Sequence, residues 1–347
     1  MSPSGGAERA GGADGAVGGA AVGGDAAVAT LPRTAGGPTI DARSYGARGD
    51  GVADDTRALQ AGLAAASGGR FFLPAGRYRV DADYGQGGSL QPASDTEIVL
   101  DAGATLKAMS SATPFSAVFF LRAVDRVSIA GGAIVGDRAG HFNTEGEQGH
   151  LLNVVGCADI TVSDIRLSGA WGDGMIVAYD DSSDRICERV DLRRVECHEN
   201  RRQGLSIVVA DRVTVVDCVF SGTSGVAPAA GADIEPDRPW SVSHVLFERC
   251  SFHNNSGSGL QITGLASPGG CRDIRIQSCQ AYGNSRSGVA LFESDGVEID
   301  DLTAHDNGDF GFHAVTTKGL DLRSKALWAN GRGDTYVDEA TRLGAVK

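Results

Sequence analysis

Three carboxylates lie within five residues in the stretch GADIEPD, residues 231–237. Asp233 and Glu235 alternate there with Ala232 and Ile234, which is the two-residue period of a β-strand. Both acids should therefore leave the same face of one strand, with Cβ atoms roughly 6.5 to 7 Å apart. The two carboxyl groups of inverting glycosidases lie about 6.5 to 9.5 Å apart, so the pair has a spacing suited to acid and base chemistry on a sugar.

Basic and polar groups are expected beside these acids. Arg201 and Arg202 occur in the stretch NRRQG of the preceding sequence unit, about one strand spacing (roughly 4.8 Å) away. A guanidinium fork suits the carboxylate of a uronic acid. The candidate catalytic residues are Asp233, Glu235, Arg202 and Asp173. The candidate substrate-binding residues are Arg201, Gln203, His253, Gln261, Asp237 and Phe292.

Two simpler interpretations compete with a catalytic one. Outward acids on a strand are commonly only solvated, and His253 fits an ordinary surface turn. Clustered carboxylates also attract calcium, although the adjacent Arg201 and Arg202 would oppose a cation. We therefore predict direct catalysis without a resident metal or other cofactor, with calcium as the alternative.

The elements that must position these residues form a repeat from about residue 156. Short runs of the V-x-V type recur with separations of 30, 23, 32, 29, 23 and 23 residues. The runs begin at Ile160, Val190, Val213, Val245, Ile274, Val297 and Leu320. A unit of 23 residues with inserted loops predicts a β-solenoid.

Each unit contains alternating apolar residues that predict two short strands around a bend. Aligning the units predicts one inward column of Ile165, Val195, Cys218, Cys250, Cys279 and Leu302. We expect its cysteines to act as small buried hydrophobes rather than as redox or metal-binding groups. The chain has seven cysteines and no CxxC motif, which fits a reducing compartment and no structural zinc site.

A further strand in each unit follows a glycine, as in GMIV, GLSI and GADI. Its first outward column is predicted to contain Ile176, Ser206, Asp233, Gln261, Ala290 and His313. The second is predicted to contain Ala178, Val208, Glu235, Thr263, Phe292 and Val315. Asn precedes the glycine by four residues at Asn200, Asn255, Asn284 and Asn307. Ala170 and Ala227 stand at this spacing in the other two units, so the predicted asparagine column is interrupted beside the acids.

The N-terminal part has a different pattern. The stretch YGARGDGVADDTRALQ predicts a turn and then a helix over roughly 55–66, which Asp54 or Asp55 can cap. Leu59 and Leu63 lie on one face of this helix, which could cover the open end of the solenoid.

This stretch, with FFLPAGRYRV after it, resembles the N-terminal cap of the pectate-lyase-like superfamily. HENRRQGLSI, GADIEPD and FHNNSGSGLQI extend the resemblance over about residues 39–335. The resemblance implies an all-β, right-handed, single-stranded parallel β-helix with a short capping helix. We divide the chain into a Gly/Ala-rich disordered tail (1–38), a cap (39–80), coils (81–335) and a C-terminal tail (336–347).

The resemblance implies a carbohydrate-active enzyme without fixing its reaction, because the superfamily contains hydrolases, lyases, epimerases and tailspikes. The Tyr-Gly-x-Asp-Pro-His run of the epimerases corresponds to AWGDGMIV, where only Asp173 offers similar chemistry. This sequence resembles the calcium-dependent pectate lyases only loosely. The Gly-His-Gly and Arg-Ile-Lys elements of polygalacturonases are missing from it. The acid pair favours a glycoside hydrolase over a uronate lyase or C5-epimerase.

Two other functions fit the sequence. The predicted outward face includes Ile176, Val208 and Phe292, so a β-helix enzyme could act inside the cell on a small apolar biosynthetic intermediate. A non-catalytic glycan-binding solenoid is the third possibility.

Composition limits the partners to a glycan or a small molecule. The net charge of −13 argues against nucleic acid and anionic membranes. No apolar run approaches the roughly 18 residues of a membrane span. The Gly/Ala-rich start lacks a basic region and a strong apolar segment, so we predict a cytoplasmic protein, or a secreted one if a leader is missing. The oligomeric state is left open.

Overall fold

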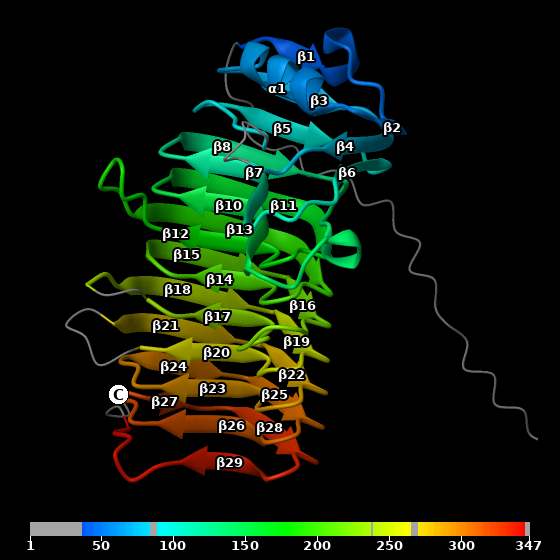
Figure 1. The fold of residues 1–347 in the computed structure, drawn as a ribbon. Coiled ribbons are helices and arrows are strands. Elements are labelled where there is room, and N and C mark those ends of the chain that lie inside the picture. Colours follow the sequence, from blue (N-terminus) through cyan, green and yellow to red (C-terminus); the bar gives the residue numbers. More distant parts are fainter. Residues whose placement is uncertain (1–36, 84–88, 237–238, 265–269, 344–347) are drawn as a thin grey trace, which may run out of the picture. The chain divides into compact units, whose positions relative to one another are not determined.

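The computed structural model describes residues 37–83, 89–236, 239–264 and 270–343. The predicted tail therefore lies almost entirely outside the described residues. Within these ranges the strands form two sheets, sheet A with 20 strands and sheet B with nine. Their pairings are parallel, and Figure 1 shows the strands of sheet B stacked in chain order.

Sheet A supplies the first strands of each coil. Its members are β1 (Thr39–Asp41), β2 (Asp50–Asp54), β3 (Arg70–Leu73), β4 (Gly76–Val80), β5 (Glu97–Leu100), β6 (Ala104–Ala108), β8 (Asp125–Ala130), β9 (Ala133–Val135), β11 (Ala158–Ser168), β13 (Cys187–His198), β15 (Ala210–Val216), β16 (Val219–Ser221), β18 (Val242–Glu248), β19 (Ser251–His253), β21 (Cys271–Gln277), β22 (Gln280–Tyr282), β24 (Val297–Asp300), β25 (Leu302–His305), β27 (Asp321–Leu322) and β28 (Lys325–Trp328).

Sheet B supplies one further strand in each coil, and in the coils of the sequence repeat this strand lies at the glycine of the repeat. Its members are β7 (Phe115–Arg122), β10 (Gln148–Val155), β12 (Met175–Ala178), β14 (Leu205–Ile207), β17 (Ala232–Ile234), β20 (Leu260–Thr263), β23 (Val289–Phe292), β26 (Phe310–Val315) and β29 (Gly333–Val337). The predicted end of the coils at residue 335 falls inside β29, because that strand pairs with β26 through Val337.

The observed register confirms the first predicted outward column of sheet B. Ile176, Ser206, Asp233, Gln261, Ala290 and His313 are paired from strand to strand. The alternating apolar residues between them face the interior, since a strand directs successive side chains to opposite sides.

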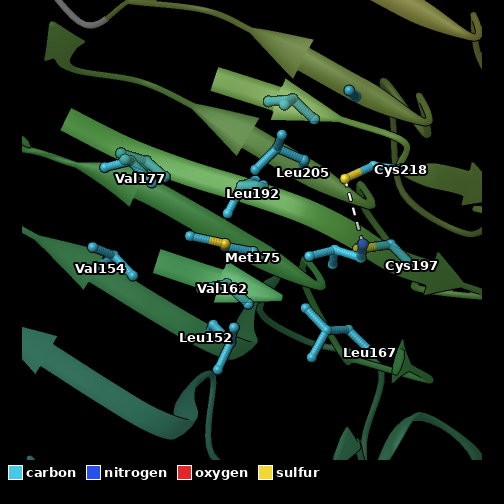
Figure 2. Packing of buried hydrophobic residues seen from close by; sticks show 14 of the residues in the cluster. Leu152, Val154, Val162, Leu167, Met175, Val177, Leu192, Cys197, Leu205 and Cys218 are labelled. Carbon is cyan, nitrogen blue, oxygen red and sulfur yellow. Dashed lines mark hydrogen bonds between the residues drawn. The ribbon is translucent and has the colours of Figure 1, made fainter. Parts of the chain in front are cut away.

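The interior is one apolar core enclosed by the coils. Figure 2 shows part of it, where Leu152, Met175 and Leu205 come from successive strands of sheet B and share the core with Cys197 and Cys218. The predicted inward column is confirmed, and all six of its residues are at most 2% exposed. All seven cysteines are buried free thiols.

Helix α1 (Thr56–Ala65) confirms the helix predicted over 55–66. The carboxylate of Asp54 accepts the backbone N–H of Thr56, whereas Asp55 accepts those of Arg48 and Gly49. Leu59 and Leu63 are fully buried. Figure 1 shows α1 beside β1 and β3, at the N-terminal end of the coils. Where the chain is described, short 3-10 helices occur in connections as η1 (Ala42–Tyr45) and η3 (Arg138–Gly140).

In the ranges given above, no helix is long and apolar enough to cross a membrane.

Candidate active site

Asp233 and Glu235 lie at β17 of sheet B, on the outer side of the coil, and Asp173 lies just before β12, two strands away. Asp233 of β17 pairs in register with Ser206 of β14 and Gln261 of β20. Asp233 is only 2% exposed, whereas Glu235 is half-buried. The outward register predicted for Asp233 is confirmed, but its side chain is buried because Gln203 of the preceding coil lies against it.

Asp173 organises these polar side chains. Its carboxylate is fully buried, and Oδ1 accepts the backbone N–H of Gln203 at 3.0 Å. Oδ2 accepts a hydrogen bond from the Ser206 hydroxyl at 3.0 Å and one from Nη1 of Arg202 at 3.2 Å. These donors satisfy the buried charge, as burial of a carboxylate requires. Asp173 therefore acts as an anchor for the coil that follows it.

Gln203 connects this anchor to Asp233. Its Oε1 accepts from Nη1 of Arg202 at 2.7 Å, and its Nε2 donates to Oδ2 of Asp233 at 3.0 Å. The two contacts fix the orientation of the amide. Oδ1 of Asp233 and Nε of Arg202 are buried and have no hydrogen-bond partner among the described residues. Such atoms are rare in native proteins, and they mark a place where a water or ligand atom can bind.

The surroundings change the acidity of Asp233. Burial raises the pKa of its carboxyl to about 7, and the nearby negative charge of Glu235 acts in the same direction. Arg202 and the hydrogen bond from Gln203 oppose part of that rise in the pKa. Asp233 is therefore largely protonated below neutral pH, unlike an ordinary aspartate.

His150, which the sequence analysis missed, extends the network by one coil. The backbone N–H of Asp173 donates to its Nδ1 at 3.1 Å, and its Nε2 lies 3.1 Å from Oε1 of Gln148. This pattern assigns the proton to Nε2, so the 3.4 Å approach of Nδ1 to the Asp173 carboxylate is not an ion pair. Burial lowers the pKa of His150, which agrees with a neutral ring. The repeat alignment began near residue 156 and so excluded the strand that contains His150.

Arg201 points to a different part of the molecule from Arg202. Its guanidinium lies 3.7 Å from the ring centre of Trp171 and donates to the carbonyls of Gly146 and Thr144 at 2.8 and 3.2 Å. His141 stacks on Trp171 at 3.9 Å, which requires the opposite ring face. Arg201 thus holds the 144–146 segment in place. Its position does not support the predicted contact with substrate.

The remaining predicted binding residues are spread over two sheets. Gln261 adjoins Asp233 in register, and Phe292 lies at the end of β23, in edge contact with His313 at 5.3 Å. His253 ends β19 and pairs with Ser221 of sheet A, so it does not occupy the turn equivalent to the arginines. Asp237 lies outside the described residues.

The interruption of the asparagine column is real, but one of its positions was assigned wrongly. The backbone N–H of Thr223 donates to Oδ1 of Asn255 at 3.0 Å, so Thr223 occupies the column position, not Ala227. Thr223 precedes Gly231 by eight residues, whereas the other coils use four. The longer connection passes beside the site, where the N–H of Val226 donates to the carbonyl of Arg201 at 2.9 Å.

The acids of this site do not form a metal-binding cluster among the described residues. No group of three or more His, Cys, Asp or Glu residues that could hold a metal ion occurs where the chain is described. Arg202 is the neighbour of Asp173, and a guanidinium is a poor companion for a hard cation.

The family model named "Right handed beta helix region" matches residues 240–327. The chain is a right-handed parallel β-helix. Among curated proteins it is 28% identical over 240 residues to the uncharacterized protein YclG of Bacillus subtilis, covering 62% of this chain and 41% of YclG. The matched part of the chain therefore spans about two fifths of the length of that relative.

Solved structures agree on the fold. The tailspike gp49 of Acinetobacter baumannii bacteriophage Fri1, a capsular polysaccharide depolymerase, superposes with a TM-score of 0.66 at 15% identity, covering 88% of this chain and 57% of gp49. The A-module of mannuronan C-5 epimerase AlgE4 from Azotobacter vinelandii gives a TM-score of 0.51 at 15% identity, covering 89% of this chain and 100% of that module. At this identity the likeness establishes the architecture alone.

Proposed function

We propose that this β-helix is a glycoside hydrolase acting on a polysaccharide or oligosaccharide. The observation that carries the proposal is a carboxyl group with a pKa of about 7, Asp233, two residues from the half-buried carboxylate of Glu235 on one strand face. Two carboxyl groups whose environments differ in this way suit the separate roles of acid and base. The polysaccharide-processing names of two structural neighbours support the substrate class.

In this mechanism Asp233 is the general acid. Its proton passes to the glycosidic oxygen as the bond from that oxygen to the anomeric carbon breaks. Glu235 removes a proton from the water whose oxygen forms the new bond to the anomeric carbon. The spacing of the two residues, roughly 6.5 to 7 Å between Cβ atoms, leaves room for this water and predicts inversion of configuration.

The other polar residues position the acid. Gln203 holds one oxygen of Asp233, which leaves Oδ1 for the proton and the substrate. Asp173 and Arg202 fix Gln203 in turn. Oδ1 of Asp233 is buried in the free protein, so the groups around it must move when the substrate binds. The substrate would enter from the side where Glu235 lies, because Glu235 is only half-buried.

Elimination or epimerisation of a uronan is the second candidate, since it would use an arginine to neutralise a uronate. Its weakness lies in Arg202, whose side chain is only 17% exposed and is tied to Asp173. A guanidinium already paired with a carboxylate is poorly placed to receive a second one.

Incubation with a panel of neutral and uronate-containing polysaccharides tests the proposal. Hydrolysis produces new reducing ends without unsaturated products, and Asp233→Asn should lower kcat by about 10²- to 10⁴-fold. Asp301→Asn, which changes an exposed aspartate between β24 and β25, should retain full activity. EDTA should not reduce the rate, because the proposed step needs no metal.

Unsaturated ends would instead support elimination. Full activity of Asp233→Asn would remove Asp233 from the mechanism. Binding of an apolar metabolite with no turnover of any glycan would favour the intracellular alternative.

A further inference from the structure

A ladder of aromatic rings lies on sheet A, separate from the residues of the candidate active site. One column of the sheet's register passes through Ser168, His198, Ser221, His253, Tyr282, His305 and Trp328. The last four rings stack in sequence, with centroid separations of 4.8, 5.2 and 4.4 Å. Their planes are within 9° of parallel at each step.

The ladder has one rung per coil, because its separations match the spacing of neighbouring strands, about 4.8 Å. Within the stack each ring covers the face of the next. His253 ends the stack on the N-terminal side, because the neighbouring position there is Ser221, which has no ring. The following ring, His198, is two strand spacings from His253, roughly 9.6 Å along the column.

A cleft of about 480 Å³ opens at this missing rung. His198, Ser221 and His253 line it, together with Arg166, Glu199 and Asn254. The cleft thus combines an aromatic ring that lacks one neighbour with charged and amide groups able to hydrogen bond. Its volume lies within the range of roughly 300 to 1,000 Å³ that is typical of ligand pockets.

The wall of the cleft opposite His253 is held in place. Nδ1 of His198 lies 2.6 Å from the Ser221 hydroxyl, and its Nε2 lies 3.3 Å from a carboxylate oxygen of Glu196. The Ser221 hydroxyl is therefore engaged, and the gap is not filled by a rotation of that small side chain. Burial and the nearby His198 lower the pKa of His253, which keeps its ring neutral at pH 7.

We infer that this cleft binds a small ligand through a flat aromatic or heteroaromatic ring, which stacks on His253 as the missing rung. The near-parallel planes of the existing rungs favour a flat ring over a puckered one. Offset stacking of such rings is favourable beyond the area they bury. Arg166, Glu199 and Asn254 would contact polar groups on the ligand's edge. This site is independent of the proposed hydrolase activity.

Titration of the full chain with adenosine and, separately, with indole tests this inference. The ring-proton NMR signals of His253 should move upfield and saturate. Ser221→Tyr supplies the rung and should weaken binding at least tenfold, while raising the melting temperature. His253→Ala removes the stacking surface and should weaken binding to the same extent. Ser128→Tyr, on sheet A outside the cleft, should bind as the unchanged protein does.

Saturation by adenosine alone would show that the polar edge contributes, and saturation by indole would show that the ring suffices. The absence of a saturable shift with both ligands would overturn the inference, as would equal binding by Ser221→Tyr. Equal binding of methyl glucoside would also overturn it, because a puckered ring would then serve as well. If Ser221→Tyr does not fold, His253→Ala decides the outcome.

Discussion

At the scale of single residues, Asp233 combines a role in the proposed chemistry with a cost in stability. Its pKa is about 7 in the folded protein against an ordinary value of 3.8, so the folded state binds more protons between these values than the unfolded state does. The contribution of Asp233 to stability must therefore fall as pH rises from about 4 to 7. A change of three pKa units corresponds to about 4 kcal/mol.

Asp233→Asn removes this penalty and should be more stable than the unchanged protein at pH 8, with little gain at pH 4. Urea unfolding at both pH values measures the difference, with Asp301→Asn as the exposed control. An equal effect at both pH values would show that Asp233 does not carry the raised pKa.

At the scale of elements, the asparagine column shows what the sequence could predict and what it could not. The alternation of apolar residues predicted the strands and the register of Asp233, because a period of two determines which side chains face the core. It did not predict burial of Asp233, which depends on Gln203 reaching across from the preceding coil. The spacing rule also selected Ala227, because four extra residues precede Gly231 and shift the count.

The same column yields a prediction for the element. Asn200 Nδ2 and Thr223 Oγ1 are both buried and unpaired in the described structure. Neighbouring asparagines pair across coils, as when Asn255 Nδ2 donates to Oδ1 of Asn284 at 2.9 Å. Thr223→Asn should restore this contact and stabilise the β-helix by about 1 to 2 kcal/mol. The midpoint of urea unfolding measures the gain, with Thr303→Asn on the surface of β25 as control. A loss of stability would mean that the longer connection requires the threonine.

At the scale of the described coils as a whole, one core runs from α1 to the last strands, and its thiols can report whether it opens as a unit. The seven cysteines lie between residues 157 and 279, and all are buried. Burial raises the pKa of Cys157 to about 12 and that of Cys187 to about 11, so their reactive thiolate forms are scarce. Each coil packs only on its neighbours, and a solenoid of this kind can open locally or all at once. The continuous core predicts that the coils open all at once.

A disulfide reagent such as DTNB should therefore modify none of the thiols rapidly in native buffer. In increasing urea all seven should react with one rate, equal to the rate of loss of the β-sheet circular dichroism signal. Complete reaction in guanidinium chloride provides the count of seven. Rapid modification of a subset in native buffer would show that the middle coils open separately, and mass spectrometry of the modified peptides would identify them.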